Sequence, residues 1–164
     1  MFKTIFLVFA LVFSSIVGHT QAVQPAPQTT LAPFEVTLVN GQKYKSFQLK
    51  KGEPVMLMYF SPECDHCRDL TKEIVKNLKS LGKKQLTMIT YFPETEVKKF
   101  VNDLGLQKYP NIKVGTEGMS LIVQKHYNIR NFPFIALYDK SGNMKKIFRE
   151  QTPAAEIVKA MAAL

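Results

Sequence analysis

Residues 55–67 read VMLMYFSPECDHC and contain the only two cysteines of the 164-residue chain. The first six of these residues form an apolar run without polar alternation, which is typical of a strand buried on both faces of a sheet. Beyond Cys67, apolar residues recur every three or four positions as far as Leu81, and Gly82 ends the pattern, so a helix is predicted. Cys64 is therefore expected where a buried strand meets a helix, with Cys67 one turn into that helix.

The rest of the chain alternates between strand and helix patterns. An Asn40-Gly41 pair between two β-prone runs predicts a hairpin near the N-terminus. The two strands of this hairpin are expected in residues 34–39 and 43–49. Other strands are expected in residues 86–92, 112–114, 132–138 and 144–149, and other helices in residues 95–104, within 118–127, and after Pro153. This order predicts an α/β fold with a central mixed sheet flanked by helices and with an N-terminal β-hairpin.

The first residues predict export. Lys3 gives a basic start, and the apolar run of residues 5–18 is too short for a bilayer, which needs about 20 residues. Thr20 and Ala22 occupy the minus-three and minus-one positions of a cleavage site. Residues 1–22 are therefore expected to be a secretory signal peptide, and the expected location is the periplasm, across the inner membrane. An uncleaved N-terminal anchor is the alternative interpretation.

The mature chain is expected to contain one domain. Residues 23–33 are rich in Pro, Gln, Thr and Ala without hydrophobic period, and predict a flexible tether before a domain in residues 34–164. The formal net charge is +9, but the basic residues are scattered along the chain. Solvated faces explain such a distribution, so no nucleic-acid partner is expected. The protein is expected to be a monomer and to use no cofactor.

Three interpretations of the cysteine pair compete. A zinc site usually has four ligands, and besides Cys64 and Cys67 the mature chain offers only His66 and His126, so no metal site is predicted. A structural disulfide between the cysteines would close a loop of only four residues and would restrict the unfolded chain very little. A reactive pair has better physical support.

The reactive interpretation assigns different tasks to the two cysteines. At a helix N-terminus, unpaired backbone N–H groups and the helix dipole stabilise a thiolate at Cys64, and the thiolate is the nucleophilic form. His66 adds positive charge when protonated, and is expected to tune the pKa of the Cys64 thiol. Cys67 would attack a mixed disulfide formed at Cys64 and release the reduced partner.

The sequence resembles the thioredoxin superfamily, in particular its secreted bacterial TlpA-like branch of thiol–disulfide oxidoreductases. The match rests on residues 55–67 with the helix that follows, on NFPFIALYD (131–139) and on SGNMKKIF (141–148), and covers the whole expected domain. The resemblance implies a thioredoxin-like fold in which Pro133 forms a cis peptide bond beside the cysteines and the Phe132 backbone binds an extended substrate. It also implies exported protein disulfides or dithiols as substrates, and makes a membrane electron donor a candidate partner.

The sequence departs from the superfamily in ways that leave the activity open. Met58 stands where many thioredoxins have a buried carboxylate that assists the second cysteine. The Cys-X-His-Cys motif resembles that of disulfide isomerases and oxidases, whereas the TlpA-like branch is mostly reductive, so the direction of electron flow is undecided. A peroxiredoxin-like thiol peroxidase is one alternative, because Ser61 lies three residues before Cys64. A copper-binding thioredoxin-like metallochaperone using Cys64, Cys67 and His126 is another.

Overall fold

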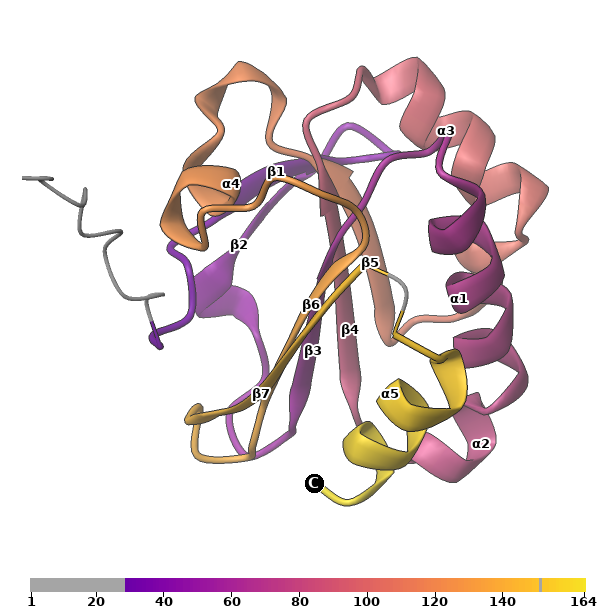
Figure 1. Cartoon of the computed structure of the whole chain (residues 1–164). Helices are drawn as coiled ribbons and strands as arrows, with labels where there is room; N and C mark the ends of the chain where they lie inside the picture. The colour runs from indigo at the N-terminus through magenta and orange to yellow at the C-terminus, as the bar shows by residue number, and fades with distance from the viewer. Residues whose placement is uncertain (1–28, 151) are drawn as a thin grey trace, which may run out of the picture.

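The structure, a computed structural model, describes residues 29–150 and 152–164. Within them, seven strands form one mixed sheet in the order β2-β1-β5-β4-β3-β6-β7 (Figure 1). The strands are β1 (Glu35–Leu38), β2 (Lys43–Lys45), β3 (Val55–Tyr59), β4 (Gln85–Thr90), β5 (Ile112–Thr116), β6 (Phe134–Tyr138) and β7 (Met144–Arg149). The predicted mixed sheet and its N-terminal hairpin, β1 with β2, are confirmed.

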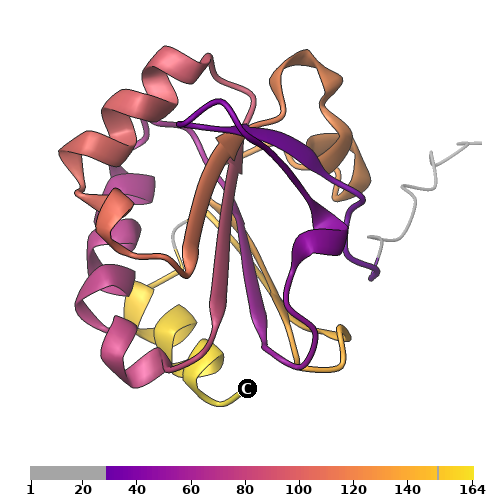
Figure 2. The same ribbon diagram turned by 180° about the vertical axis from the view of Figure 1, so that it is seen from behind.

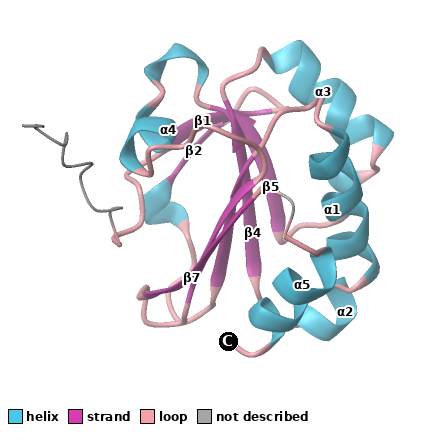
Figure 3. Ribbon diagram, in the orientation of Figure 1, coloured by secondary structure: helices cyan, strands magenta, loops and turns pink. Residues whose placement is uncertain are grey.

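The helices cover the two faces of the sheet unequally, as the colouring of Figure 3 shows. The helices are α1 (Asp65–Lys76), α2 (Leu78–Leu81), α3 (Glu94–Asp103), α4 (Ile122–His126) and α5 (Ala154–Ala162). Among the helices of the described residues, α4 packs on one face of the sheet, and α1, α2, α3 and α5 pack on the other. The helix expected to continue to Leu81 is divided at Asn77, whose side-chain amide donates a hydrogen bond to the Glu73 carbonyl at 2.8 Å. Asparagine competes for backbone groups in this way and thereby disfavours a continuous helix.

Strand β3 is buried along its entire length because both of its faces pack into hydrophobic cores. Met56 and Met58 point into the core beneath α1, α3 and α5, whereas Leu57 and Tyr59 point into the core beneath α4. Successive side chains of a strand alternate between the faces of a sheet. A strand with a core on each side therefore needs apolar residues at every position, which explains the unbroken run in the sequence.

The direction of the central strands brings several loops to one edge of the sheet. Strands β3, β4 and β5 run parallel, so their carboxyl ends meet at the upper edge in Figures 1 and 2. Strand β6 runs antiparallel to β3, with Phe134 opposite Tyr59, and therefore begins at this edge. The cysteine motif after β3, the segment that starts at Glu117 after β5, and the Phe132–Pro133 segment before β6 consequently lie along the same edge.

The folded part of the chain begins earlier than residue 34, within the segment expected to be a tether. Ala32 is fully buried, and its backbone N–H donates a hydrogen bond to the Tyr127 hydroxyl at 2.9 Å. The Thr30 carbonyl accepts a hydrogen bond from His126 Nε2 at 2.8 Å. The expected signal peptide and residues 23–28 of the expected tether lie outside the described residues. Within the described ranges, no helix has the length and apolar character needed to cross a membrane.

Gly115 provides a test of how closely the hairpin is attached to the rest of the sheet. A Cβ atom at this position would lie 2.8 Å from the Thr37 carbonyl oxygen and 2.9 Å from a methyl group of Val36, both in β1. We expect Gly115→Ala to lower the free energy of unfolding by about 1–3 kcal/mol, because β1 must move away from β5. Urea denaturation measures this change. Lys113→Ala in the same strand is the control, with a change of at most about 0.5 kcal/mol, and equal losses for both variants would contradict the prediction.

Candidate active site

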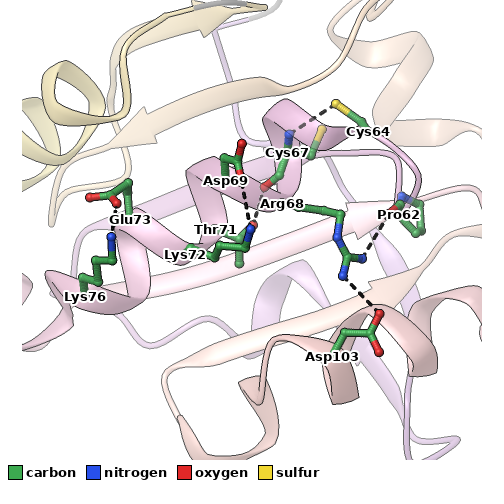
Figure 4. Close-up of polar contacts among 10 residues, drawn as sticks. All are labelled: Pro62, Cys64, Cys67, Arg68, Asp69, Thr71, Lys72, Glu73, Lys76 and Asp103. Carbon is green, nitrogen blue, oxygen red and sulfur yellow. Dashed lines mark hydrogen bonds and ion pairs between the residues drawn. The ribbon is translucent and has the colours of Figure 1, made fainter.

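Cys64 is the N-cap residue of α1. Its backbone is extended, with φ −81° and ψ 114°, and its sulfur accepts a hydrogen bond from the backbone N–H of Cys67 at an N–S distance of 3.2 Å (Figure 4). The sulfur therefore occupies the place that a Ser, Thr or Asp oxygen takes at most helix starts. A hydrogen bond of this kind is stronger when the acceptor is ionised, so the position suits a thiolate nucleophile.

The two thiols differ in their surroundings. Cys64 is partly exposed, whereas Cys67 is fully buried in the core beneath α1 and α5, and both are free thiols. Burial raises the pKa of the Cys67 thiol far above its ordinary value, and the hydrogen bond with Cys64 raises it further. At neutral pH, Cys67 is therefore a protonated thiol, and Cys64 is the sulfur that a substrate can reach.

The segment before β6 lies against Cys64. The peptide bond between Phe132 and Pro133 is cis, and the Cys64 sulfur lies 4.0 Å from the Phe132 carbonyl oxygen. The Phe132 ring packs against Tyr59 at a centroid distance of 6.0 Å and against Tyr91 at 6.3 Å. The fold thus brings Tyr91 and the Phe132–Pro133 segment, which are far from the motif in sequence, to the end of β3, and places the Phe132 backbone next to the exposed sulfur.

A cavity of about 400 Å³ opens beside Cys64. Its lining combines the partly exposed Cys64 sulfur with charged side chains of both signs: Ser61, Glu63, Cys64, His66, Arg130, Asn131, Phe132 and Glu150. Glu150 directly follows β7 and has a left-handed conformation, with φ 53°; its backbone N–H donates a hydrogen bond to the Pro133 carbonyl at 2.9 Å. The Glu150 carboxylate accepts a hydrogen bond from the Asn131 side-chain amide. Glu150 therefore fastens the Phe132–Pro133 segment from the side opposite Tyr59.

His66 lies in the first turn of α1, between the two cysteines. Its side chain is exposed and lines the cavity beside Cys64 as well as a second hollow of about 290 Å³ between α1 and α5. Solvent screens the charge of an exposed group, so any tuning of Cys64 by His66 is limited to a small effect.

Arg68 is a supporting residue that the sequence interpretation missed. Its guanidinium donates hydrogen bonds to the Pro62 carbonyl at 3.5 Å and to Asp103 Oδ2 at 3.0 Å, as Figure 4 shows. Asp103 also accepts a hydrogen bond from Lys99, and together these two bonds lower the pKa of the Asp103 carboxyl. Arg68 thereby ties the loop before Cys64 to the end of α3. No sequence signal identifies this link, because Asp103 lies 35 residues away.

The carboxylate that many thioredoxins bury near the second cysteine is absent from β3. Met58 is 1% exposed and belongs to the same core as Cys67, in agreement with the departure seen in the sequence. A buried carboxylate does exist at Glu117, directly after β5, but it accepts a hydrogen bond from Tyr59 on the opposite face of the sheet. The sequence interpretation missed Glu117, since a single acid after a short strand carries no distinguishing pattern.

The structure separates His126 from the cysteine pair. His126 Nε2 contacts the Thr30 carbonyl, and within residues 29–150 and 152–164 no three His, Cys, Asp or Glu side chains gather in a way that could hold a metal ion. The copper set of Cys64, Cys67 and His126 is therefore not assembled. Ser61, considered for a peroxidase, shapes the turn before Cys64: its Oγ accepts the Glu63 N–H at 3.3 Å and its carbonyl accepts the Cys64 N–H at 3.2 Å.

Comparison with known proteins gives one family. The sequence profile of the thioredoxin-like domain matches residues 42–164. A protein disulfide-isomerase of Aspergillus oryzae is 26% identical over 106 residues, which make up 65% of this chain but span only 20% of the relative's length.

Two solved structures share the fold. A secreted disulfide oxidoreductase of Mycobacterium tuberculosis, homologous to DsbE of E. coli, superposes with a TM-score of 0.68 at 18% identity, over 80% of this chain and 96% of that one. The exposed lipoprotein thioredoxin Etrx1 of Streptococcus pneumoniae superposes with a TM-score of 0.63 at 22% identity, over 80% of this chain and 98% of that one. These likenesses show that the chain shares the thioredoxin-like fold.

The unequal burial of the thiols predicts unequal reactivity. We expect iodoacetamide to modify Cys64 of the reduced, folded protein at least about tenfold faster than Cys67 at pH 7–8, because only the accessible thiolate reacts. Cys67 should react slowly as long as the protein stays folded, because it is buried and burial raises the pKa of its thiol. Timed labelling followed by peptide mass spectrometry measures both rates. In concentrated urea the two rates should converge, and similar rates in the folded protein would contradict the assignment.

Proposed function

The chain belongs to the thioredoxin-like domain family, and on this basis we propose that it is a thiol–disulfide oxidoreductase that acts through Cys64 and Cys67. The family's fold alone does not decide an activity. The observation that carries the proposal is the pairing of an accessible sulfur at the N-cap of α1 with a buried thiol one turn later, beside the Phe132–Pro133 segment.

The geometry supports a two-step exchange. In the first step the Cys64 thiolate attacks a substrate disulfide; one substrate sulfur becomes bonded to Cys64, and the other leaves as a thiolate that takes up a proton. In the second step Cys67 attacks the Cys64 sulfur, so that the Cys64–Cys67 disulfide forms and the second substrate sulfur leaves. Two electrons have then passed from the protein to the substrate, and the reverse sequence oxidises a dithiol.

The second step requires Cys67 to lose its proton. Burial raises the pKa of this thiol, and Met58 provides no base where a carboxylate is common in the superfamily. The departing substrate thiolate is itself a base, formed next to Cys67 as the new disulfide forms. The proton of Cys67 therefore passes to the leaving sulfur, directly or through water in the cavity, and atoms and charges balance without a further group.

The substrates are exported proteins, and the protein works as a monomer in the periplasm. The signal-peptide pattern of residues 1–22 supports this location, and disulfides persist in such a compartment. The open cavity beside Cys64, about 400 Å³ in volume and lined by charged side chains of both signs, suits a polypeptide segment. Reduction or isomerisation is the favoured direction, and repeated reduction needs an electron donor, for which a membrane protein is the candidate.

Trapping of the mixed disulfide tests the proposed function. With Cys67→Ser the second step is blocked, so a covalent complex between Cys64 and a disulfide-containing protein such as insulin should accumulate. Cys64→Ser is the matched control and should trap nothing, because Cys67 is buried. Non-reducing electrophoresis and mass spectrometry detect the complex. Accumulation with Cys64→Ser but not with Cys67→Ser would reverse the two roles, and accumulation with neither would refute the exchange reaction.

The tuning role of His66 has its own test. We expect His66→Gln to lower the redox potential of the Cys64–Cys67 couple by about 10–20 mV, because an exposed charge contributes at most about 1 kcal/mol and 30 mV corresponds to 1.4 kcal/mol. Equilibration with glutathione buffers measures the potential. His126→Gln on α4 is the control, and identical potentials for wild type and His66→Gln would remove His66 from the mechanism.

A further inference from the structure

Glu117 is a buried acid for which the exchange reaction has no direct use. It follows β5 immediately and is 8% exposed. Its carboxylate accepts three hydrogen bonds: from the Tyr59 hydroxyl at 2.6 Å, from the Val123 backbone N–H at 2.8 Å and from the Gln124 backbone N–H at 3.3 Å. A buried carboxylate is tolerated only with such partners. The three hydrogen bonds therefore fix the position of Glu117, and they also restrain Tyr59 and the start of α4.

The first of these contacts reaches the active site through an aromatic ring. Tyr59 is the last residue of β3 and is fully buried, and its ring packs against the Phe132 ring at a centroid distance of 6.0 Å. Burial and the hydrogen bond to Glu117 raise the pKa of the Tyr59 hydroxyl far above its ordinary value, so it remains a donor. The Tyr59 side chain is thereby held at both ends: its backbone belongs to β3, and its hydroxyl is hydrogen-bonded to Glu117.

The hydrogen bonds from the Val123 and Gln124 backbone N–H groups to Glu117 are connected to Phe132 through the backbone. Val123 and Gln124 lie in the first turn of α4, and the chain continues from α4 through residues 127–131 to Phe132. The Phe132 carbonyl oxygen then lies 4.0 Å from the Cys64 sulfur. One carboxylate therefore restrains the residue that packs on the Phe132 ring and also the helix that delivers the Phe132 backbone.

We propose that Glu117 and Tyr59 are positioning residues that hold Phe132 in the conformation in which its backbone receives an extended peptide substrate at Cys64. This inference rests on the proposed exchange function and concerns how the site around Cys64 binds peptide substrates. Neither residue touches the reacting sulfurs. Loss of the link lets the Phe132 segment sample other positions, so peptide binding weakens while the chemistry at Cys64 is unchanged.

The test separates peptide binding from the reactivity of the sulfur. Tyr59→Phe removes only the hydroxyl group and keeps the ring against Phe132. We expect it to raise KM for a peptide disulfide three- to tenfold with kcat within twofold of wild type. The rate with dithionitrobenzoate, a small aromatic disulfide without a peptide backbone, should stay within twofold. Thermal unfolding, measured in parallel, reports how far the variant is destabilised.

Tyr138→Phe is the matched control. Tyr138 is also a buried tyrosine on the same face of the sheet, and its hydroxyl is hydrogen-bonded to Tyr127 at 2.5 Å, at the far end of β6 from Phe132. It should lower the melting temperature to a similar extent but leave KM unchanged, because a smaller folded fraction lowers the apparent kcat and not KM. Equal KM values for wild type, Tyr59→Phe and Tyr138→Phe would overturn the positioning role.

A second variant keeps the test independent of the tyrosine. Glu117→Gln preserves the size of the side chain but replaces one acceptor oxygen with a donor amide, so at least one of its three hydrogen bonds is lost. If the two residues act as one link, Glu117→Gln should also raise KM, and the double variant should raise it by less than the product of the two single increases. Fully additive increases would contradict a shared link. Absence of exchange activity in the wild-type protein would instead refute the proposed function, so the two failures are distinguishable.

Discussion

The hydrogen bond from the Cys67 backbone N–H to the Cys64 sulfur is the interaction on which the site depends. It exists because β3 ends at Tyr59, at the edge of the sheet where the parallel strands end, and α1 starts six residues later at Asp65, so that Cys64 falls at the N-cap. The same arrangement places Cys67 in the core, where burial keeps it protonated. One local geometry therefore leaves the Cys64 sulfur accessible at the helix start and buries the Cys67 thiol in the core.

The two faces of the sheet support this geometry with different links. On the face of α1 and α3, Arg68 joins the Pro62 carbonyl to Asp103 and fastens the loop before Cys64. On the face of α4, Glu117 joins Tyr59 to the start of that helix, and both lead to Phe132. Charged groups thus restrain the chain on each side of the exposed sulfur, and the buried strand β3 lies between these two sets of contacts.

Much of the fold could be predicted from the sequence because its signals are local. The double-sided burial of β3 is visible as an unbroken apolar run, and the helix start is visible because the cysteines follow that run directly. The break at Asn77 was not predicted, since apolar spacing continues through it and only a side-chain hydrogen bond marks it. The links of Arg68 with Asp103 and of Tyr59 with Glu117 join residues 35 and 58 positions apart, and only the folded topology brings them together.

The central claim is that Cys64 and Cys67 form one reversible dithiol–disulfide couple, and equilibration with glutathione buffers under anaerobic conditions tests it most directly. The account predicts a single two-electron transition between about −270 and −120 mV, the range spanned by thioredoxin and the strongest oxidase of this kind. The transition should disappear when either cysteine is replaced. A protein that only becomes glutathionylated at Cys64, with no internal disulfide at any potential, would contradict the account.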